Sequence, residues 1–297
     1  MIELDYERTV TRQLVHRRAL SEVFLTDSRR VDESRFVAGA QLPPSHAYYT
    51  DHRVPGVDPL LLLECCRQAE THAVHAHFGA PLDTKFVLRD WSLRTHLDDV
   101  PDRPAEVAIT TTTHDARWQG ERLRELSYRM RVEVAGTHAA DVRMRVQYVP
   151  DATYQVLRAR RRAGAPPTSD QFREVPAGVP PWRVARSSPD NVILLDPEVG
   201  PRGVRARLRI AGDHPSLFDH AQDHVPGMVL MEAGRQAAVL VSGETWRMTG
   251  LDATLAAYAE LDSPITVAAQ DKYNGVHVAF FFFNDTATTE IYTGGLT

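Results

Sequence analysis

The sequence predicts an α+β protein made of two copies of one unit, in which an antiparallel β-sheet wraps around a long central α-helix. Three observations support this prediction. One stretch recurs at a constant spacing, each copy contains a long apolar helical segment, and strand-like segments follow each helix. A helix with a long apolar face has to bury that face against another layer, and the strands that follow it can supply that layer.

The repeat is the strongest of the three observations. Residues 46–69 and 214–237 align without a gap, and aligned positions such as 46 and 214 always differ by 168. The identical aligned pairs include eight that mark the repeat, several of them in uncommon polar types: His46/His214, Asp51/Asp219, His52/His220, Leu62/Leu230, Glu64/Glu232, Arg67/Arg235, Gln68/Gln236 and Ala69/Ala237. Chance is a poor explanation for this agreement, so we interpret the chain as a duplicated unit of about half its length.

Each copy contains one predicted helix. In the first copy it runs from about Pro59 to Phe78, where Leu at 60–63 and Ala at 69, 73 and 76 recur at helical spacing. The stretch Gly79-Ala80-Pro81 is a natural helix stop. In the second copy the helix runs from about Pro226 to Trp246.

Alternating, β-branched segments separated by turn residues predict strands after each helix. In the first copy they are residues 84–96, 105–114, 122–136 and 137–149, and the shorter segments RQLVH, EVFLT and SRFVAGAQL precede the helix. In the second copy, residues 204–212 precede the helix, and residues 249–263, 264–270 and 275–280 follow it.

Changes in composition predict the domain limits. The first domain covers residues 1–149 and the second covers 182–280; residues 150–181, rich in Pro, Gly and charge, form a short helix and a linker. The basic run RARRR in this linker is interpreted as a solvated helix end. Residues 281–297 contain no Arg and resemble a translated sequencing-adapter read, so we expect a non-native tail rather than a natural Thr-rich one.

Composition narrows the class of protein. The 297 residues carry a net charge of −5 and a pI of about 6.2, which gives no electrostatic preference for nucleic acid or anionic membranes. No apolar run is long enough to span a membrane, and the charged N-terminus lacks the apolar core of a signal peptide. Cys65 and Cys66 are neighbours in a predicted helix, a poor geometry for a disulfide. A reducing, cytoplasmic location is therefore expected.

The second-copy motif, HPxxFDHxxDHVPGMxLMEAxRQA, resembles the signature of the A-factor biosynthesis family, whose members have tandem hot-dog domains. The first copy shows a weaker form of it, and the resemblance extends to about residue 280. It implies a double hot-dog fold with five to seven antiparallel strands around each helix, and an internal pseudodimer of the two copies; further homo-oligomerisation stays open.

The resemblance also implies an activity. Members of this family are taken to transfer a β-ketoacyl group from acyl carrier protein to the hydroxyl of dihydroxyacetone phosphate, the first step towards a γ-butyrolactone signal. The partners implied are therefore acyl carrier protein, a β-ketoacyl thioester and dihydroxyacetone phosphate, with no cofactor. Hot-dog dehydratases and thioesterases have similar motifs and remain alternatives, as does an acyl-binding protein without catalytic activity.

The residues of the second copy fit acyl transfer. Pro226-Gly227 opens the helix, and free N–H groups there, including those of Gly227 and Met228, can bind a thioester carbonyl and stabilise an oxyanion. Glu232 is the candidate general base for the acceptor hydroxyl, because a charge on an apolar helix face costs free energy unless it has a role. Arg235 lies on the same face and can hold the phosphate or orient the glutamate.

Two further questions stay open at the level of sequence. Glu64 and Arg67 are the first-copy equivalents, but Asp58-Pro59 replaces Pro-Gly there, so either two sites operate or one operates and the other supports it. Alternatively, each Glu–Arg pair is a buried ion pair that only sets the register of the helix.

The histidines give weaker signals. His52 and His220 are candidate catalytic residues of the loops that precede the helices, or else they only cap those loops. Two groups have spacings that could suggest a metal: Asp219-His220 with Asp223-His224, and His72, His75 and His77. Pro226 argues against helical spacing in the first group, and cations at a helix C-terminus are favourable without a metal in the second. We therefore expect no metal site.

Overall fold

The computed structural model describes residues 2–53, 56–98, 105–162, 164–282 and 289–296. The chain divides into two compact units. Unit 1 comprises Met1–Ser45 and Gly56–Ala165, and unit 2 comprises His46–Pro55 and Pro166–Thr297. The loop His46–Pro55 therefore belongs to the first repeat in sequence but to unit 2 in space, an exchange that the domain limits drawn from composition did not anticipate.

Unit 1 is an antiparallel sheet around the helix α1 (Pro59–Ala76). Its strands lie in the order β1-β2-β4-β5-β6-β3, and each pairs with its neighbours in antiparallel register. Their bounds are β1 (Leu25–Arg30), β2 (Arg35–Gln41), β3 (Lys85–Thr95), β4 (Glu106–Gln119), β5 (Arg122–Val134) and β6 (Thr137–Val149). The sheet covers α1 so completely that the helix is buried along most of its length, including Cys65 and Cys66.

Unit 2 repeats this plan around α3 (Gly227–Ser242). Its strand order is β7-β8-β10-β11-β12-β9, again antiparallel throughout. The bounds are β7 (Leu194–Gly200), β8 (Gly203–Leu208), β9 (Arg247–Thr254), β10 (Ile265–Lys272), β11 (Gly275–Phe282) and β12 (Thr289–Leu296). If the strands of each unit are numbered in chain order, the two sheets have the same strand order. The duplication and the fold class predicted from the sequence are confirmed.

Short 3₁₀ turns and one linker helix complete the chain. The turns are η1 (Arg12–Val15), η2 (Leu20–Glu22), η3 (Ser169–Gln171), η4 (Pro181–Val184) and η5 (Pro189–Asn191). The linker helix predicted after residue 150 is α2 (Asp151–Arg161). No helix among the described residues has both the length and the apolar character needed to cross a membrane.

Several predicted boundaries were wrong. The helix of unit 2 ends at Ser242, because Gly243 has a φ of 102° and leaves the helical conformation. The strand predicted over residues 249–263 ends at Thr254. The segment RQLVH contains the turn η1 and no strand, and β7 was missed because its sequence, LLDPEVG, reads as a turn.

The segment predicted as a non-native tail includes a strand of unit 2. β12 pairs with β11 on one side and β9 on the other, and the side chain of its residue Ile291 is buried. It takes the position in unit 2 that β6 takes in unit 1. That residues 281–297 are foreign to the natural protein stays a prediction from their composition.

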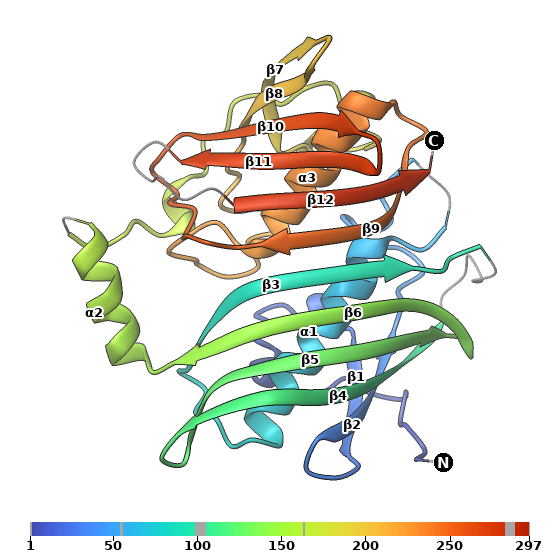
Figure 1. The fold of residues 1–297 in the computed structure, drawn as a ribbon, viewed down its shortest axis with the longest axis vertical. Helices are drawn as coiled ribbons and strands as arrows, with labels where there is room; N and C mark the ends of the chain where they lie inside the picture. Colours follow the sequence, from blue (N-terminus) through green and yellow to red (C-terminus); the bar gives the residue numbers. More distant parts are fainter. Residues whose placement is uncertain (1, 54–55, 99–104, 163, 283–288, 297) are drawn as a thin grey trace. The chain divides into compact units, whose positions relative to one another are not determined.

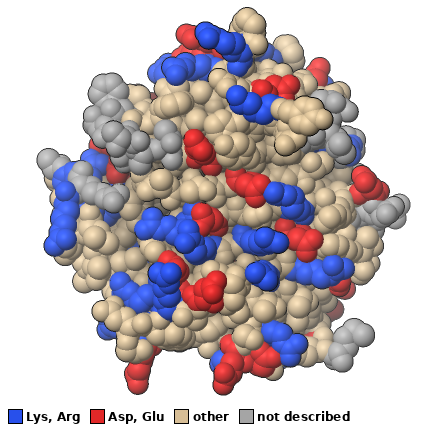
Figure 2. Space-filling view, in the orientation of Figure 1, with Lys and Arg blue, Asp and Glu red and all other residues tan. Residues whose placement is uncertain are grey.

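The outer faces of the strands are polar. Arg, Lys, Asp and Glu side chains alternate in sign over the face in Figure 2, in keeping with the small net charge. Pairs such as Arg145–Asp90 join neighbouring strands there. In each unit, one face of the sheet packs on the helix and the other face is exposed to solvent.

Candidate active site

The carboxylate of Glu232 is the centre of a buried polar network in unit 2. The side chain is fully buried in the second turn of α3. Its Oε1 accepts hydrogen bonds from Arg186 Nε at 3.0 Å and Gln236 Nε2 at 2.6 Å. Its Oε2 accepts from the Tyr48 hydroxyl at 2.9 Å and from Arg235. One glutamate thus has two guanidinium groups as partners.

Tyr48 and Arg186 hold each other as well as Glu232. The Arg186 guanidinium lies 4.5 Å above the centre of the Tyr48 ring, and its Nη1 donates to the Tyr48 carbonyl oxygen at 2.6 Å. Both side chains are fully buried. A planar guanidinium suits this position because it can stack on a ring and bond to a carboxylate at the same time.

A second layer of hydrogen bonds fixes the segments that carry these groups. Gln236 Nε2 donates to the Asn191 carbonyl oxygen at 2.7 Å, and Gln236 Oε1 accepts from the backbone N–H of Ile193 at 3.0 Å. The Asn191 side chain donates to Asp51 at 2.8 Å and lies 2.8 Å from His214 Nε2. Because His214 Nδ1 accepts backbone N–H groups, Nε2 carries the proton and donates to Asn191.

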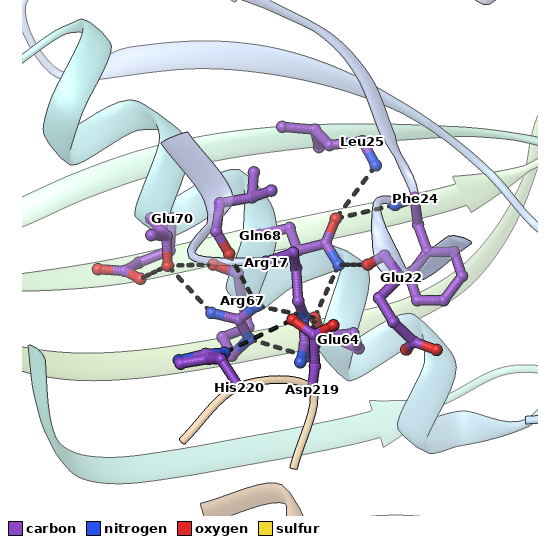
Figure 3. A network of polar contacts seen from close by, with 12 residues as sticks. Arg17, Glu22, Phe24, Leu25, Glu64, Arg67, Gln68, Glu70, Asp219 and His220 are labelled. Atoms are coloured by element: carbon purple, nitrogen blue, oxygen red, sulfur yellow. Dashed lines mark hydrogen bonds and ion pairs between the residues drawn. The ribbon is translucent and has the colours of Figure 1, made fainter. Parts of the chain in front are cut away.

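Unit 1 contains the same arrangement around Glu64 (Figure 3). Glu64 Oε1 accepts from Arg17 Nη2 at 2.6 Å, and Arg67 Nε donates to Oε2 at 2.8 Å. Gln68 bonds to Glu64 and to the Glu22 carbonyl oxygen, each at 2.7 Å, and accepts from the Phe24 N–H at 2.9 Å. Burial raises the pKa of Glu64, but the two guanidinium groups outweigh it and lower the pKa to about 2.

Arg17 and Arg186 are equivalent residues that the sequence alignment missed. They are 169 positions apart, whereas the helix residues are 168 apart. Each follows a 3₁₀ turn that ends in a residue with positive φ: His16 at 52° and Ala185 at 54°. A signal was present in the sequence, because a Val-x-Arg triplet precedes both loops at that second spacing, but a triplet is too short to find without the structure.

The two helix N-termini differ in a way that bears on catalysis. In α1 the first residue is Pro59, which has no N–H, and the N–H of Leu60 donates to the Asp58 carboxylate at 2.8 Å. In α3 the N-cap residue is Pro226 and makes no side-chain cap. The intrahelical bonds begin at Val229, which donates to the Pro226 carbonyl oxygen at 3.0 Å. Unit 2 therefore has at its helix start the Gly227 and Met228 N–H groups that an oxyanion requires.

Glu70 is a second buried carboxyl group, close to the Glu64 network, and its pKa is shifted in the opposite direction. Burial raises its pKa to about 7. Tyr148 donates to its Oε1 at 2.6 Å, and Thr71 Oγ1 lies 3.0 Å from its Oε2. The Thr71 hydroxyl has one proton, which it donates to the Arg67 carbonyl oxygen at 2.9 Å. A hydrogen bond between Thr71 and Glu70 therefore needs a proton on Oε2 of Glu70. Glu70 aligns with Ala238 in the second copy, so the repeat does not mark this residue.

The predicted loop histidines, His52 and His220, make other contacts within unit 2. His52 pairs through its backbone with Arg186, and the side chain of this loop that reaches Glu232 is that of Tyr48. His220 has its Nε2 2.6 Å from Gln222 and its Nδ1 3.5 Å from Asp219. Tyr48 aligns with Ser216, so the repeat gave no reason to single it out.

The side chains considered above for a metal make contacts with neighbouring protein groups. His224 Nδ1 lies 2.6 Å from the adjacent Asp223 carboxylate. In α1, His75 contacts the Ala80 carbonyl oxygen at 2.9 Å and His16 at 2.8 Å, while His77, just past the helix, lies 3.0 Å from the Ser28 hydroxyl. Burial lowers the pKa of His72 to about 4.

Comparison with known proteins decides the family. The model of the A-factor biosynthesis hotdog domain matches residues 3–150 and 168–279. This chain belongs to that family. A relative from Streptomyces virginiae, named 2-oxo-3-(phosphooxy)propyl 3-oxoalkanoate synthase, is 37% identical over 266 residues, which is 88% of this chain and 87% of the relative. One of the same name from Streptomyces coelicolor is 31% identical over 259 residues, 86% and 80% of the two chains.

Solved structures agree on the fold. An acyl-ACP thioesterase from Bacteroides thetaiotaomicron has a TM-score of 0.51 at 12% identity and covers 88% of this chain and 98% of its own. A trans-AT polyketide synthase dehydratase domain from Brevibacillus brevis has a TM-score of 0.51 at 14% identity, with 92% and 97% covered. These likenesses confirm the double hot-dog architecture of the A-factor family member.

Proposed function

We propose that this protein is a 2-oxo-3-(phosphooxy)propyl 3-oxoalkanoate synthase, which transfers a β-ketoacyl group from an acyl carrier thioester to dihydroxyacetone phosphate. Membership of the A-factor family and the shared name of the two Streptomyces relatives support this activity. The hydroxyl oxygen of the acceptor attacks the thioester carbonyl. A C–O bond forms, the C–S bond breaks, and the thiolate leaves with a proton.

The site of this reaction is unit 2, at the start of α3. The difference between the N-termini of α1 and α3 supports this assignment. Gly227 and Met228 offer N–H groups to a developing oxyanion, whereas Pro59 has none to offer and the Asp58 carboxylate occupies the start of α1. A carboxylate at that position also repels an oxyanion, so the Glu64 network of unit 1 has a supporting role.

Glu232 accepts the proton of the attacking hydroxyl through Tyr48. A carboxylate has about four lone-pair positions, and Arg186, Gln236, Tyr48 and Arg235 all donate to Glu232. Of these four donors, the Tyr48 hydroxyl is the one that can pass on a proton and take another without losing its charge state. The phenol gives its proton to Oε2 as it receives the proton of the substrate.

Arg235 binds the phosphate of the acceptor. Its side chain is 11% exposed, whereas Glu232 and Arg186 are fully buried, so among these three residues it is the one that reaches the surface. A guanidinium group binds phosphate through charge-assisted hydrogen bonds, so Arg235 suits an anionic acceptor.

One assay separates this function from the alternatives. The purified protein is incubated with a β-ketoacyl carrier protein, with and without dihydroxyacetone phosphate, and loss of thioester is measured. The synthase consumes thioester only when the acceptor is present and forms a phosphorylated ester. Loss without the acceptor would indicate a thioesterase, dehydration of a 3-hydroxyacyl thioester would indicate a dehydratase, and binding without turnover would indicate an acyl-binding protein.

A further inference from the structure

A cluster of three potential metal ligands lies in unit 1, away from the glutamate networks. It consists of His96, directly after β3, with His138 and Asp141 of β6. One ligand atom from each residue lies within 4.8 Å of the others. The glutamate chemistry proposed above uses none of these residues, so the cluster calls for its own explanation.

A β-bulge brings the two β6 residues to the same face. Residues three apart on a regular strand point to opposite faces. Here the pairing of β5 with β6 moves from Val132↔Ala140 to Glu133↔His138, which leaves Ala139 as an extra residue. Ala139 and Ala140 are both buried, so His138 and Asp141 both point outward, beside His96.

The distances match the edge of a tetrahedral coordination shell. His96 Nε2 lies 3.2 Å from Asp141 Oδ2, and His138 Nε2 lies 3.1 Å from the same oxygen. In a tetrahedral zinc site with bonds of 2.0–2.1 Å, neighbouring ligand atoms are about 3.3 Å apart. The two imidazole rings are 4.5 Å apart at an interplanar angle of 36°.

Hydrogen bonding accounts for only part of this arrangement: His96 Nε2 and Asp141 Oδ2 are hydrogen-bonded at 3.2 Å. His138 Nε2 is buried and has no hydrogen-bond partner among the described residues, although an acceptor lies 3.1 Å away, so the nitrogen is not aligned with that oxygen. Asp141 is in register with Arg94 on β3 and Arg131 on β5. Arg131 nevertheless pairs with Glu133 at 3.1 Å, and the Asp141 carboxylate contacts the two histidines.

We propose that His96, His138 and Asp141 form a binding site for a divalent transition metal ion of the zinc class. Two imidazoles and one carboxylate are a typical zinc ligand set, and a fourth position is left for water because the side chains are 28–51% exposed. A bound ion joins the residue that follows β3 to the bulge of β6 and so stabilises that edge of the sheet.

The test is zinc titration of untagged, chelator-treated full-length protein by calorimetry, with Co²⁺ absorption as a spectroscopic check on tetrahedral geometry. We expect one Zn²⁺ per chain, a visible Co²⁺ band and a higher melting temperature with Zn²⁺. His138→Gln and Asp141→Asn should each weaken zinc binding at least tenfold, because loss even of a residue that only supports a metal ligand has an effect of about this size. His114→Gln alters a partly exposed histidine 3.7 Å from Asp115 and should bind like the wild type.

Two results would overturn the proposal. One is the absence of stoichiometric zinc binding by the folded wild type. The other is binding that persists unchanged in His138→Gln and Asp141→Asn, which would place the ion elsewhere, for example at His72 and His75. The buried thiols of Cys65 and Cys66 do not confuse the assay, because burial raises the pKa of both.

Discussion

The hydroxyl of Tyr48 donates a 2.9 Å hydrogen bond to the carboxylate of Glu232, 184 positions further along the chain. The loop His46–Pro55 makes this bond possible, because it belongs to the first repeat in sequence and to unit 2 in space. The catalytic proposal for Glu232 therefore depends on a residue from the other sequence repeat, and this dependence can be tested.

Tyr48→Phe should lower kcat by about 10²-fold or more, the usual effect of removing a proton-transfer group, with a small change in KM. The variant keeps the ring that Arg186 covers and removes only the hydroxyl. Steady-state kinetics of acceptor-dependent thioester loss measure the effect. Tyr49→Phe alters the adjacent buried ring, 4.7 Å away, and is the control. If Tyr48→Phe lowers the melting temperature but keeps kcat, the hydroxyl only supports the fold.

Gly227→Pro tests the oxyanion site with little change to the helix. Proline is well tolerated at the first helical position, and the preceding residue has a φ of −59° and ψ of 147°, which suits a residue before proline. The substitution removes one N–H and reproduces the start of α1. We expect kcat to fall about 10²–10³-fold. Gly227→Ala keeps the N–H and should remain active; equal losses in both variants would point to lack of space instead.

Arg235→Met should raise KM for dihydroxyacetone phosphate at least tenfold, since a charge-assisted bond to phosphate contributes about 1.5–3 kcal/mol, and should affect KM for the thioester much less. Initial rates at varied concentrations of each substrate separate the two constants. Arg205→Met, at an exposed position of β8, is the matched control. An unchanged KM for the acceptor would assign Arg235 to orientation of Glu232 alone.

Glu70 should make the protein less stable as the pH rises from 5 to 8. Its pKa in the folded state is about 7, against 4.5 ordinarily, so the folded protein retains a proton that the unfolded chain releases. The contribution of Glu70 to the free energy of unfolding is therefore greatest below about pH 4.5 and falls, by up to about 3 kcal/mol, as the pH rises to 7. Glu64, whose pKa is lowered to about 2, loses its stabilising effect only as the pH falls below 4.5.

Glu70→Gln resembles the neutral acid and isolates this effect. Its amide can accept from Tyr148 and donate to Thr71, as the protonated carboxyl does. Melting temperatures at pH 5 and pH 8 should differ less in Glu70→Gln than in the wild type. The interpretation fails if the two proteins respond equally to pH over this range.

Sequence alone accounts for the fold and for one half of each glutamate network. Glu232, Arg235 and Gln236 recur at a single spacing on helices, where contacts are local and the alignment needs no gap. Arg186 was not found because its turn lies one residue out of that register. Tyr48 was not found because its bond to Glu232 depends on which unit takes up a loop, and that choice is made by long-range packing.

The same reason explains the other omissions. Alternation along β6 places His138 and Asp141 on opposite faces until the extra residue Ala139 is known, and a bulge leaves no clear mark in the sequence. Glu70 lies in a helix with a long apolar face, and its partner Tyr148, which also bonds to Tyr128, comes from a strand far along the chain. Periodicity therefore predicts which elements form, and it does not predict which polar side chains meet between them.

The most direct test of the central claim compares Glu232→Gln with Glu64→Gln in the acceptor-dependent transfer assay. Both carboxylates are fully buried and both are bound by two arginines and a glutamine, so the substitutions perturb the fold to a similar degree, which circular dichroism and melting curves can verify. We predict that Glu232→Gln loses transfer while Glu64→Gln, assayed well below its melting temperature, retains it. Retained transfer in folded Glu232→Gln, or loss in Glu64→Gln alone, would contradict the assignment of catalysis to unit 2.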